Sequence, residues 1–255
     1  MRASGSTSSS MVGGYDWIRE TNGVLTGAER SAVRAGMRKF ARETISGFLT
    51  APLQKPRSPE NLFPEYPGTE VASAAVEMAR KQGTTLLFHG YRTWLLGTAL
   101  AEVDQADVDA ELLFVTSLLH DSGMLVSVPG EDFTRRSADA VLEVFDRAGA
   151  PRGRALEAAD AVVAHATPGL VGSTDPVAYY VQSGAMADLA GLRRWHLPSG
   201  AIGEAYARYP SHDIRRTLSA LARRNAEEVP GSRMSLLVPK PLSKALRWAL
   251  NFSAG

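Results

Sequence analysis

Apolar positions recur along most of the chain at the three- and four-residue spacing of amphipathic helices. Sustained alternation of apolar and polar positions, which would indicate strands, is absent. The pattern therefore predicts an all-α fold. The expected helices span residues 25–45, 69–82, 84–104, 107–121, 135–149, 152–165, 176–188, 211–228 and 240–252.

Local signals support several of these helix ends. Thr26 with Glu29 three residues later has the pattern of a capping box, in which each side chain bonds the backbone N–H of the other residue. Asp175 followed by Pro176 is a typical helix start. Gly123 is expected to end the helix that contains the preceding His–Asp pair.

The domain organisation is expected to be simple. Residues 1–14, MRASGSTSSSMVGG, are small and polar without the apolar stretch of a signal peptide, so we expect a disordered leader. Residues 15–255 are expected to form one helical domain, with a core over 84–195 and a C-terminal helical extension over 199–255. No segment approaches the roughly 18–20 apolar residues that span a bilayer, so we expect a cytoplasmic protein with no membrane partner.

Ionisable side chains fall on the apolar faces of four expected helices. His89, His165 and Asp188 each lie at helical spacing from apolar residues of their own segment. His120 and Asp121 follow the apolar run LLFVTSLL directly. One inward histidine is usually a hydrogen-bonded core residue, but an unpaired buried carboxylate is expensive. A bound cation would explain all of them together.

The residue types restrict what this cation would be. The chain has no cysteine, which excludes disulfides, thiolate zinc sites and a cysteine nucleophile. His89 and His120, with Asp121 and Asp188, would offer two nitrogen and two oxygen ligands. We therefore expect one divalent transition metal, zinc in the first place, with iron, manganese, cobalt or nickel as alternatives. Open coordination positions would hold a water of lowered pKa.

The sequence resembles a known superfamily at these same positions. A histidine at 89, the doublet HD at 120 and 121, and an aspartate at 188, on successive helices, are similar to the HD-domain superfamily of metal-dependent enzymes. The segments HGYRTWLLGTALA, EDFTRRSADAVLEVF, AVVAHATPG and SGAMADLAGLR resemble the cyanamide hydratase-like members, and PGSRMSLL is a weaker match. The resemblance implies an HD-domain helical bundle with extra N- and C-terminal helices.

The resemblance also implies roles for individual residues. His89, His120, Asp121 and Asp188 would hold the metal. Arg92, one turn after His89, would bind and assist the substrate, although a salt-bridged arginine fits the spacing equally well. His165 would exchange a proton with the substrate, or be a core imidazole with one backbone partner.

Three positions depart from the family pattern. Gly90 replaces a small polar residue, Ser122 replaces an aliphatic residue, and Thr134 stands where relatives often carry a glutamate. If that glutamate transfers a proton or positions the substrate in the relatives, this protein would use Glu131 or Asp132 instead, or would have a different substrate.

Several functions remain open. The first is a hydrolase or hydratase acting on a small molecule through a metal-activated water, by resemblance a nitrile-type substrate such as cyanamide. The second is a phosphohydrolase in which Arg92 and Arg193 bind the phosphate. A di-iron oxygenase and a non-catalytic binding protein are further alternatives. With 28 basic and 27 acidic residues, the net charge of +1 gives no reason to expect nucleic acid. A homo-oligomer is possible.

Overall fold

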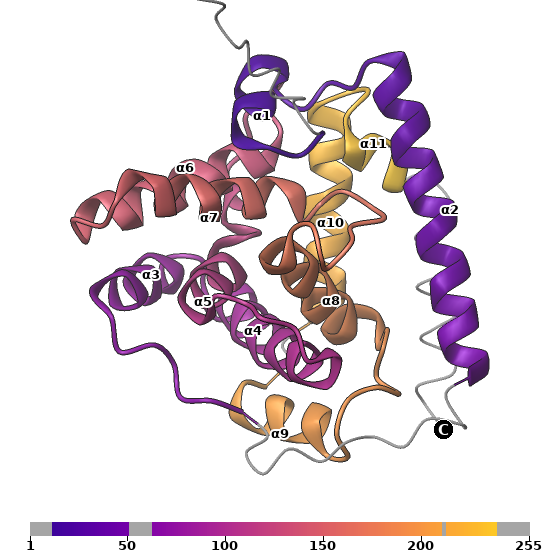
Figure 1. The fold of residues 1–255 in the computed structure, drawn as a ribbon. Coiled ribbons are helices and arrows are strands. Elements are labelled where there is room, and N and C mark those ends of the chain that lie inside the picture. The colour runs from indigo at the N-terminus through magenta and orange to yellow at the C-terminus, as the bar shows by residue number, and fades with distance from the viewer. Residues whose placement is uncertain (1–11, 51–62, 211–212, 239–255) are drawn as a thin grey trace, which may run out of the picture.

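A computed structural model describes residues 12–50, 63–210 and 213–238, and all regular secondary structure in these ranges is helical (Figure 1). The all-α prediction is therefore confirmed. In chain order the helices are α1 (Tyr15–Thr21), α2 (Gly27–Thr50), α3 (Glu70–Arg80), α4 (Thr84–Asp104), α5 (Ala110–Leu119), the 3₁₀ turn η2 (Ser122–Leu125), α6 (Phe133–Arg147), α7 (Arg152–Ala164), α8 (Pro176–Ala190), α9 (Ala201–Arg208), α10 (Ile214–Glu228) and α11 (Arg233–Leu237).

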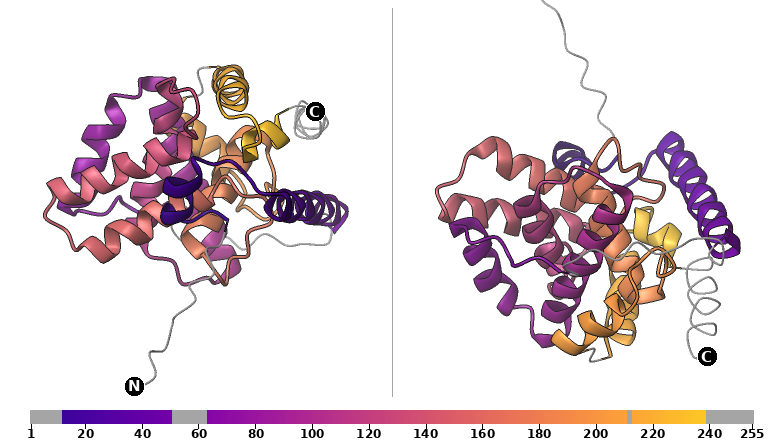
Figure 2. Two further views of the ribbon diagram at one scale, coloured as in Figure 1. Left: turned by 90° about the horizontal axis from the view of Figure 1, so that it is seen from above. Right: turned by 60° about the horizontal axis from the view of Figure 1, so that its bottom comes forward.

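The main core lies between α4, α5 and α8, with α6 and α7 packed beside them (Figures 1 and 2). Leu96 and Leu100 of α4, Phe114 of α5 and Val181 of α8 are fully buried there. The run LLFVTSLL is buried along its whole length because α5 is covered by neighbours all round. The ionisable pair that follows this run is therefore delivered into the interior.

Two glycines let α4 and α8 approach closely at their crossing. A Cβ atom added to Gly97 would lie 2.6 Å from the Tyr180 carbonyl oxygen, and one added to Gly184 would lie 2.1 Å from the Thr93 carbonyl oxygen. Only glycine fits such backbone contacts. The crossing brings the first half of α4 and the last turn of α8 side by side.

Two helix starts follow the expected capping chemistry. The Thr26 N–H donates to Glu29 Oε2 at 2.7 Å and the Glu29 N–H donates to Thr26 Oγ1 at 3.3 Å, so the capping box is confirmed. Asp175 caps α8, and Pro176 is its first residue, also as expected. Helix α2 runs along one side of the molecule with only Val33 buried (Figures 1 and 2).

A second, smaller apolar cluster joins the C-terminal helices to the middle of the chain. Ile214 and Leu218 of α10 pack with Met124 of η2 and Phe133 of α6. Arg233 in α11 is fully buried, and its Nη1 donates to the Val163 carbonyl oxygen at 2.6 Å. These contacts hold α10 and α11 against the segments that follow the His–Asp doublet.

The expectation for Gly123 was wrong. Helix α5 ends at Leu119, and His120 and Asp121 form the turn before η2. Gly123 lies inside η2, where an added Cβ atom would be 2.1 Å from the Phe133 carbonyl oxygen. Its role is to let α6 approach this turn.

Three short helices, α1, α9 and α11, were not expected. They have 7, 8 and 5 residues, too few for periodicity to be distinctive, and isolated helices of this length are unstable in water. Tertiary contacts such as those of Arg233 stabilise them instead.

Some expectations fall outside the described residues: the helix over 240–252, residues 1–11 of the leader, and residues 239–255 of the C-terminal helical extension. Within the described ranges, no helix combines the length and apolar character needed to cross a membrane.

The glycine crossing can be tested with Gly184→Ala. The new methyl group must push α8 away from α4, and overpacking of this kind costs about 1–3 kcal/mol. Gly153→Ala is the matched control, because Gly153 lies in α7 with open space around its Cβ position; it should be neutral or stabilise by less than about 1 kcal/mol. Urea unfolding of both variants measures the difference, and equal stability of the two would contradict the close crossing.

Candidate metal centre

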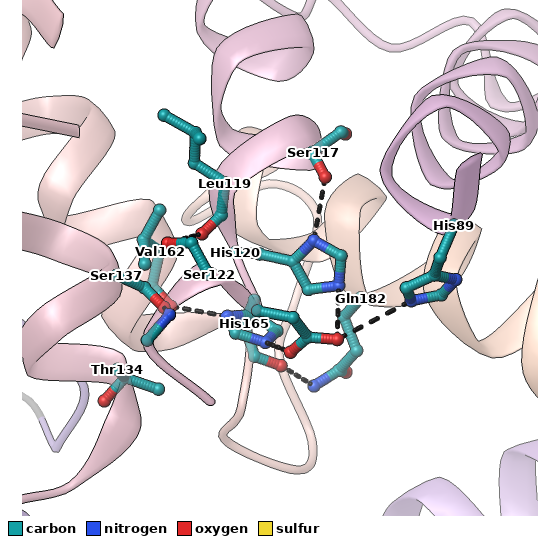
Figure 3. A network of polar contacts seen from close by, with 12 residues as sticks. His89, Ser117, Leu119, His120, Ser122, Thr134, Ser137, Val162, His165 and Gln182 are labelled. Atoms are coloured by element: carbon teal, nitrogen blue, oxygen red, sulfur yellow. Dashed lines mark hydrogen bonds and ion pairs between the residues drawn. The ribbon is translucent and has the colours of Figure 1, made fainter. Parts of the chain in front are cut away.

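Four buried ionisable side chains converge from α4, from the turn after α5 and from the end of α7, and Figure 3 labels the three histidines among them. His89 lies in the first half of α4, His120 and Asp121 lie in the turn after α5, and His165 follows the last residue of α7. His120 and Asp121 are adjacent in sequence, but α5 ends at Leu119, so their side chains need not point in the different directions that neighbours within a helix would take. All of them are more than nine-tenths buried.

Each of the three imidazoles uses its Nδ1 to bond a neighbour. His120 Nδ1 donates to the Ser117 carbonyl oxygen at 2.8 Å, and His165 Nδ1 donates to the Val162 carbonyl oxygen. His89 Nδ1 lies 2.6 Å from Asp188 Oδ2. A carbonyl oxygen only accepts, so Nδ1 must carry a proton in His120 and His165, and the Asp188 carboxylate favours the same arrangement in His89. In the neutral imidazoles the lone pair is then on Nε2.

The three Nε2 atoms surround one carboxylate. Asp121 Oδ2 lies 3.7 Å from His89 Nε2 and 3.2 Å from His120 Nε2, and Asp121 Oδ1 lies 3.9 Å from His165 Nε2. Each oxygen of Asp121 therefore faces different histidines. The side of Oδ2 is shared by His89 and His120.

His89, His120 and Asp121 lie together and could hold a metal ion. One ligand atom from each lies within 4.8 Å of the others. His89 Nε2 is buried without a hydrogen-bond partner, a costly arrangement that a cation would relieve. Two imidazole nitrogens and a carboxylate oxygen suit a divalent transition metal and do not distinguish among zinc, iron, manganese, cobalt and nickel.

The electrostatics of the cluster favour a positive charge at its centre. Burial alone would raise the pKa of Asp121, but His120 and then the other two histidines hold it well below its ordinary value. Burial alone would lower the pKa of His120, and the charge of Asp121 raises it instead. The charge of Asp121 thus favours the protonated form of His120. A metal ion at the same place would supply positive charge in place of that proton.

Asp188 is buried against the far edge of the His89 ring. Arg92 Nε donates to its Oδ1 at 2.7 Å, and Arg92 Nη2 donates to its Oδ2 at 2.9 Å. Arg92 Nη1 donates to the carbonyl oxygens of Tyr209 and Pro210 at 2.8 and 3.3 Å. Of the two interpretations open for Arg92, the structure has the salt-bridged arginine, so its expected contact with substrate stays a prediction.

Arg193 lies far from the cluster. Its Nη2 bonds both carboxylate oxygens of Asp104 at 2.8 and 3.0 Å. Asp104 ends α4, about 15 residues after His89, and at 1.5 Å per residue this separation is about 22 Å. The structure does not bring Arg193 together with the candidate metal ligands.

The acidic residues near Thr134 are also engaged elsewhere. Glu131 pairs with Arg136 at 3.2 Å and with Arg135 at 3.4 Å. Asp132 caps α6 by accepting from the Thr134 N–H and hydroxyl at 2.9 and 2.7 Å. The described contacts therefore give neither carboxylate a link to the histidines.

Two residues that support His165 were not singled out from the sequence. Gln182 Nε2 donates to the carbonyl oxygens of His165 and Thr167 at 2.6 and 2.9 Å. Arg233 bonds the Val163 carbonyl oxygen and the hydroxyls of Thr167 and Thr134. The segment PGSRMSLL contained the only signal for Arg233, and nothing in the pattern distinguished Gln182 from a surface glutamine.

No protein-family model matches the chain, and no curated protein matches it either. The function is therefore inferred from the residues of the cluster and their geometry.

The protonation of His165 gives a test of this geometry in metal-free protein. Burial, and next the neighbouring His120, lower the pKa of His165 from 6.5 to about 3. The unfolded chain takes up this proton below about pH 6.5 and the folded chain does not. The stability due to neutral His165 is therefore complete above pH 6.5 and is lost as the pH falls toward 3, by at most about 1.4 kcal/mol per pH unit.

His165→Asn removes this dependence, so the variant should gain stability relative to the native sequence as the pH falls from 7 to 4.5. Urea unfolding in the presence of a chelator measures both proteins at each pH. Parallel stability curves would show that His165 is not held neutral in the folded state.

Proposed function

We propose that this protein is a metal-dependent hydrolase or hydratase of the HD-domain type. The observation that supports this most strongly is the arrangement of His89, His120 and Asp121, whose ligand atoms face one another in a buried site. His89 Nε2 has no other partner there. The sequence resembles HD-domain enzymes, and these three residues stand at three of the four positions to which the resemblance gives metal ligands, the fourth being Asp188.

The residues would divide the work as follows. His89, His120 and Asp121 would hold one divalent transition metal, which when bound supplies a water of lowered pKa as nucleophile. Asp121 would bind the metal through one oxygen and accept a hydrogen bond from that water through the other, which faces His165. His165 has an unprotonated Nε2 directed at the same place and would accept a hydrogen bond there from the water or the substrate, since its lowered pKa makes it a weak base.

The two arginines expected to bind phosphate are both paired with carboxylates, which favours a substrate without a phosphate group. A phosphohydrolase needs donors for phosphate oxygens, and the pattern assigned these to Arg92 and Arg193. Arg92 is fully buried with Asp188, and Arg193 is paired with Asp104 far along α4. We therefore infer a small electrophile without a phosphate group, and the nitrile-type group suggested by the family resemblance fits this description.

The experiment is a substrate panel with metal-loaded protein. Cyanamide and small aliphatic nitriles should be hydrated, and nucleoside monophosphates should release no phosphate. Metal-dependent phosphate release would overturn the substrate class and return Arg92 to the role of phosphate ligand. Turnover that persists after complete removal of metal would overturn the proposed function.

Asp121→Asn tests the carboxylate itself. The amide has nearly the same shape but carries no charge, so bound metal and activity should both fall by more than about 100-fold, beyond the range typical for residues that only support a ligand. Asp104→Asn is the control, because Asp104 is a carboxylate bonded by an arginine at the other end of α4, away from the histidines. Metal content and initial rates are measured for both, and full metal content in Asp121→Asn would contradict its role as ligand.

A further inference from the structure

The surroundings of Asp188 determine what this carboxylate can do. Its Oδ1 accepts from Arg92 Nε at 2.7 Å, and its Oδ2 accepts from Arg92 Nη2 at 2.9 Å and lies 2.6 Å from His89 Nδ1. Asp188 is 1% exposed, so water does not compete for these bonds. The two oxygens of Asp188 thus face three protein donors, one at Oδ1 and two at Oδ2.

These bonds place Asp188 behind His89 as seen from the cluster. The Nδ1 of His89 bonds Asp188, and its Nε2 faces Asp121 at 3.7 Å. An ion on Nε2 would sit about 2.1 Å from that nitrogen. The width of the ring and the 2.6 Å hydrogen bond then separate the ion from the carboxylate. In agreement, the described ligand atoms that lie within 4.8 Å of one another belong to His89, His120 and Asp121, without Asp188.

We propose that Asp188 is a positioning residue that Arg92 holds in place, and that it fixes the tautomer of His89 without binding the metal. This inference rests on the proposed metal site and departs from the ligand role that the family resemblance gives to Asp188. A carboxylate that accepts from Nδ1–H keeps the lone pair of the imidazole on Nε2 and makes that nitrogen a better ligand.

Arg92 connects this pair to the C-terminal part of the molecule. Its guanidinium bonds the carbonyl oxygens of Tyr209 and Pro210 and lies 4.8 Å from the centre of the Tyr206 ring. The Tyr206 hydroxyl in turn donates to the Asp188 carbonyl oxygen at 3.0 Å. The segment around α9 therefore supports His89 without touching the cluster, which explains why a fully buried arginine occurs one turn after a metal ligand.

The first test needs no metal. In protein with ¹⁵N-labelled histidine, long-range ¹H–¹⁵N spectra report which ring nitrogen of His89 carries the proton, and the native sequence should show it on Nδ1. In Asp188→Asn, Arg92 should take the single amide oxygen and leave the amide N–H₂ facing Nδ1, so that the proton moves to Nε2. An unchanged Nδ1–H tautomer in Asp188→Asn would overturn the inference.

The second test measures cobalt(II) binding to the same proteins. If Asp188 only positions His89, Asp188→Asn still binds one equivalent with an unchanged visible spectrum, but its affinity is about 10–100-fold weaker. Arg92→Lys, which keeps the charge but cannot bond both oxygens, should weaken binding in the same direction with the same spectrum. If Asp188 is a ligand, its replacement changes the cobalt spectrum, and the inference is wrong.

Controls separate the possible failures. Asp104→Asn disrupts another arginine–carboxylate pair, which is partly exposed and lies at the other end of α4, and should leave both the His89 tautomer and cobalt affinity unchanged. Circular dichroism shows whether each variant folds. If Asp188→Asn does not fold, Arg92→Lys is the milder change that tests the same contact. If the native sequence binds no cobalt, the proposed function fails, whereas the tautomer measurement still decides the role of Asp188.

Discussion

The burial of one carboxylate among three imidazoles is the constraint on which the rest of the structure depends. Asp121 would be unfavourable in this interior without compensating partners beside it, and the Nε2 atoms of the three histidines face its oxygens only because their rings are correctly turned. Each ring is fixed by one bond at Nδ1: to a backbone carbonyl at a helix end for His120 and His165, and to a carboxylate for His89. These bonds at Nδ1 therefore determine which ring nitrogen of each histidine faces Asp121.

These supporting bonds need helices in particular positions. Gly97 and Gly184 allow α4 and α8 to cross closely enough for His89, Arg92 and Asp188 to meet. Gly123 allows α6 to approach the turn that holds His120 and Asp121. The carbonyls at the end of α7 are bonded by His165, Arg233 and Gln182, which together fix that helix end. The glycines and the buried arginines therefore help to position the helices that carry the histidines and Asp121.

Periodicity was sufficient for the long helices and for the burial of the ionisable residues. The helix over 84–104 has the predicted bounds, and His89, His120, Asp121, His165 and Asp188 are all buried. Pairing could not be predicted in the same way, because a spacing of one turn brings Arg92 to the same side as His89 without saying which carboxylate it meets. That partner lies 96 residues away in sequence. The short helices α1, α9 and α11 were missed for a related reason, since distant contacts and not local periodicity stabilise them.

The proposed metal site is measured most directly by a crystal structure of the metal-loaded protein with anomalous diffraction at the absorption edge of the metal. We expect one strong peak bonded to His89 Nε2, His120 Nε2 and an oxygen of Asp121 at about 2.0–2.2 Å, with Asp188 still bonded to Arg92. A loaded protein without a peak at these three residues would contradict the proposed site.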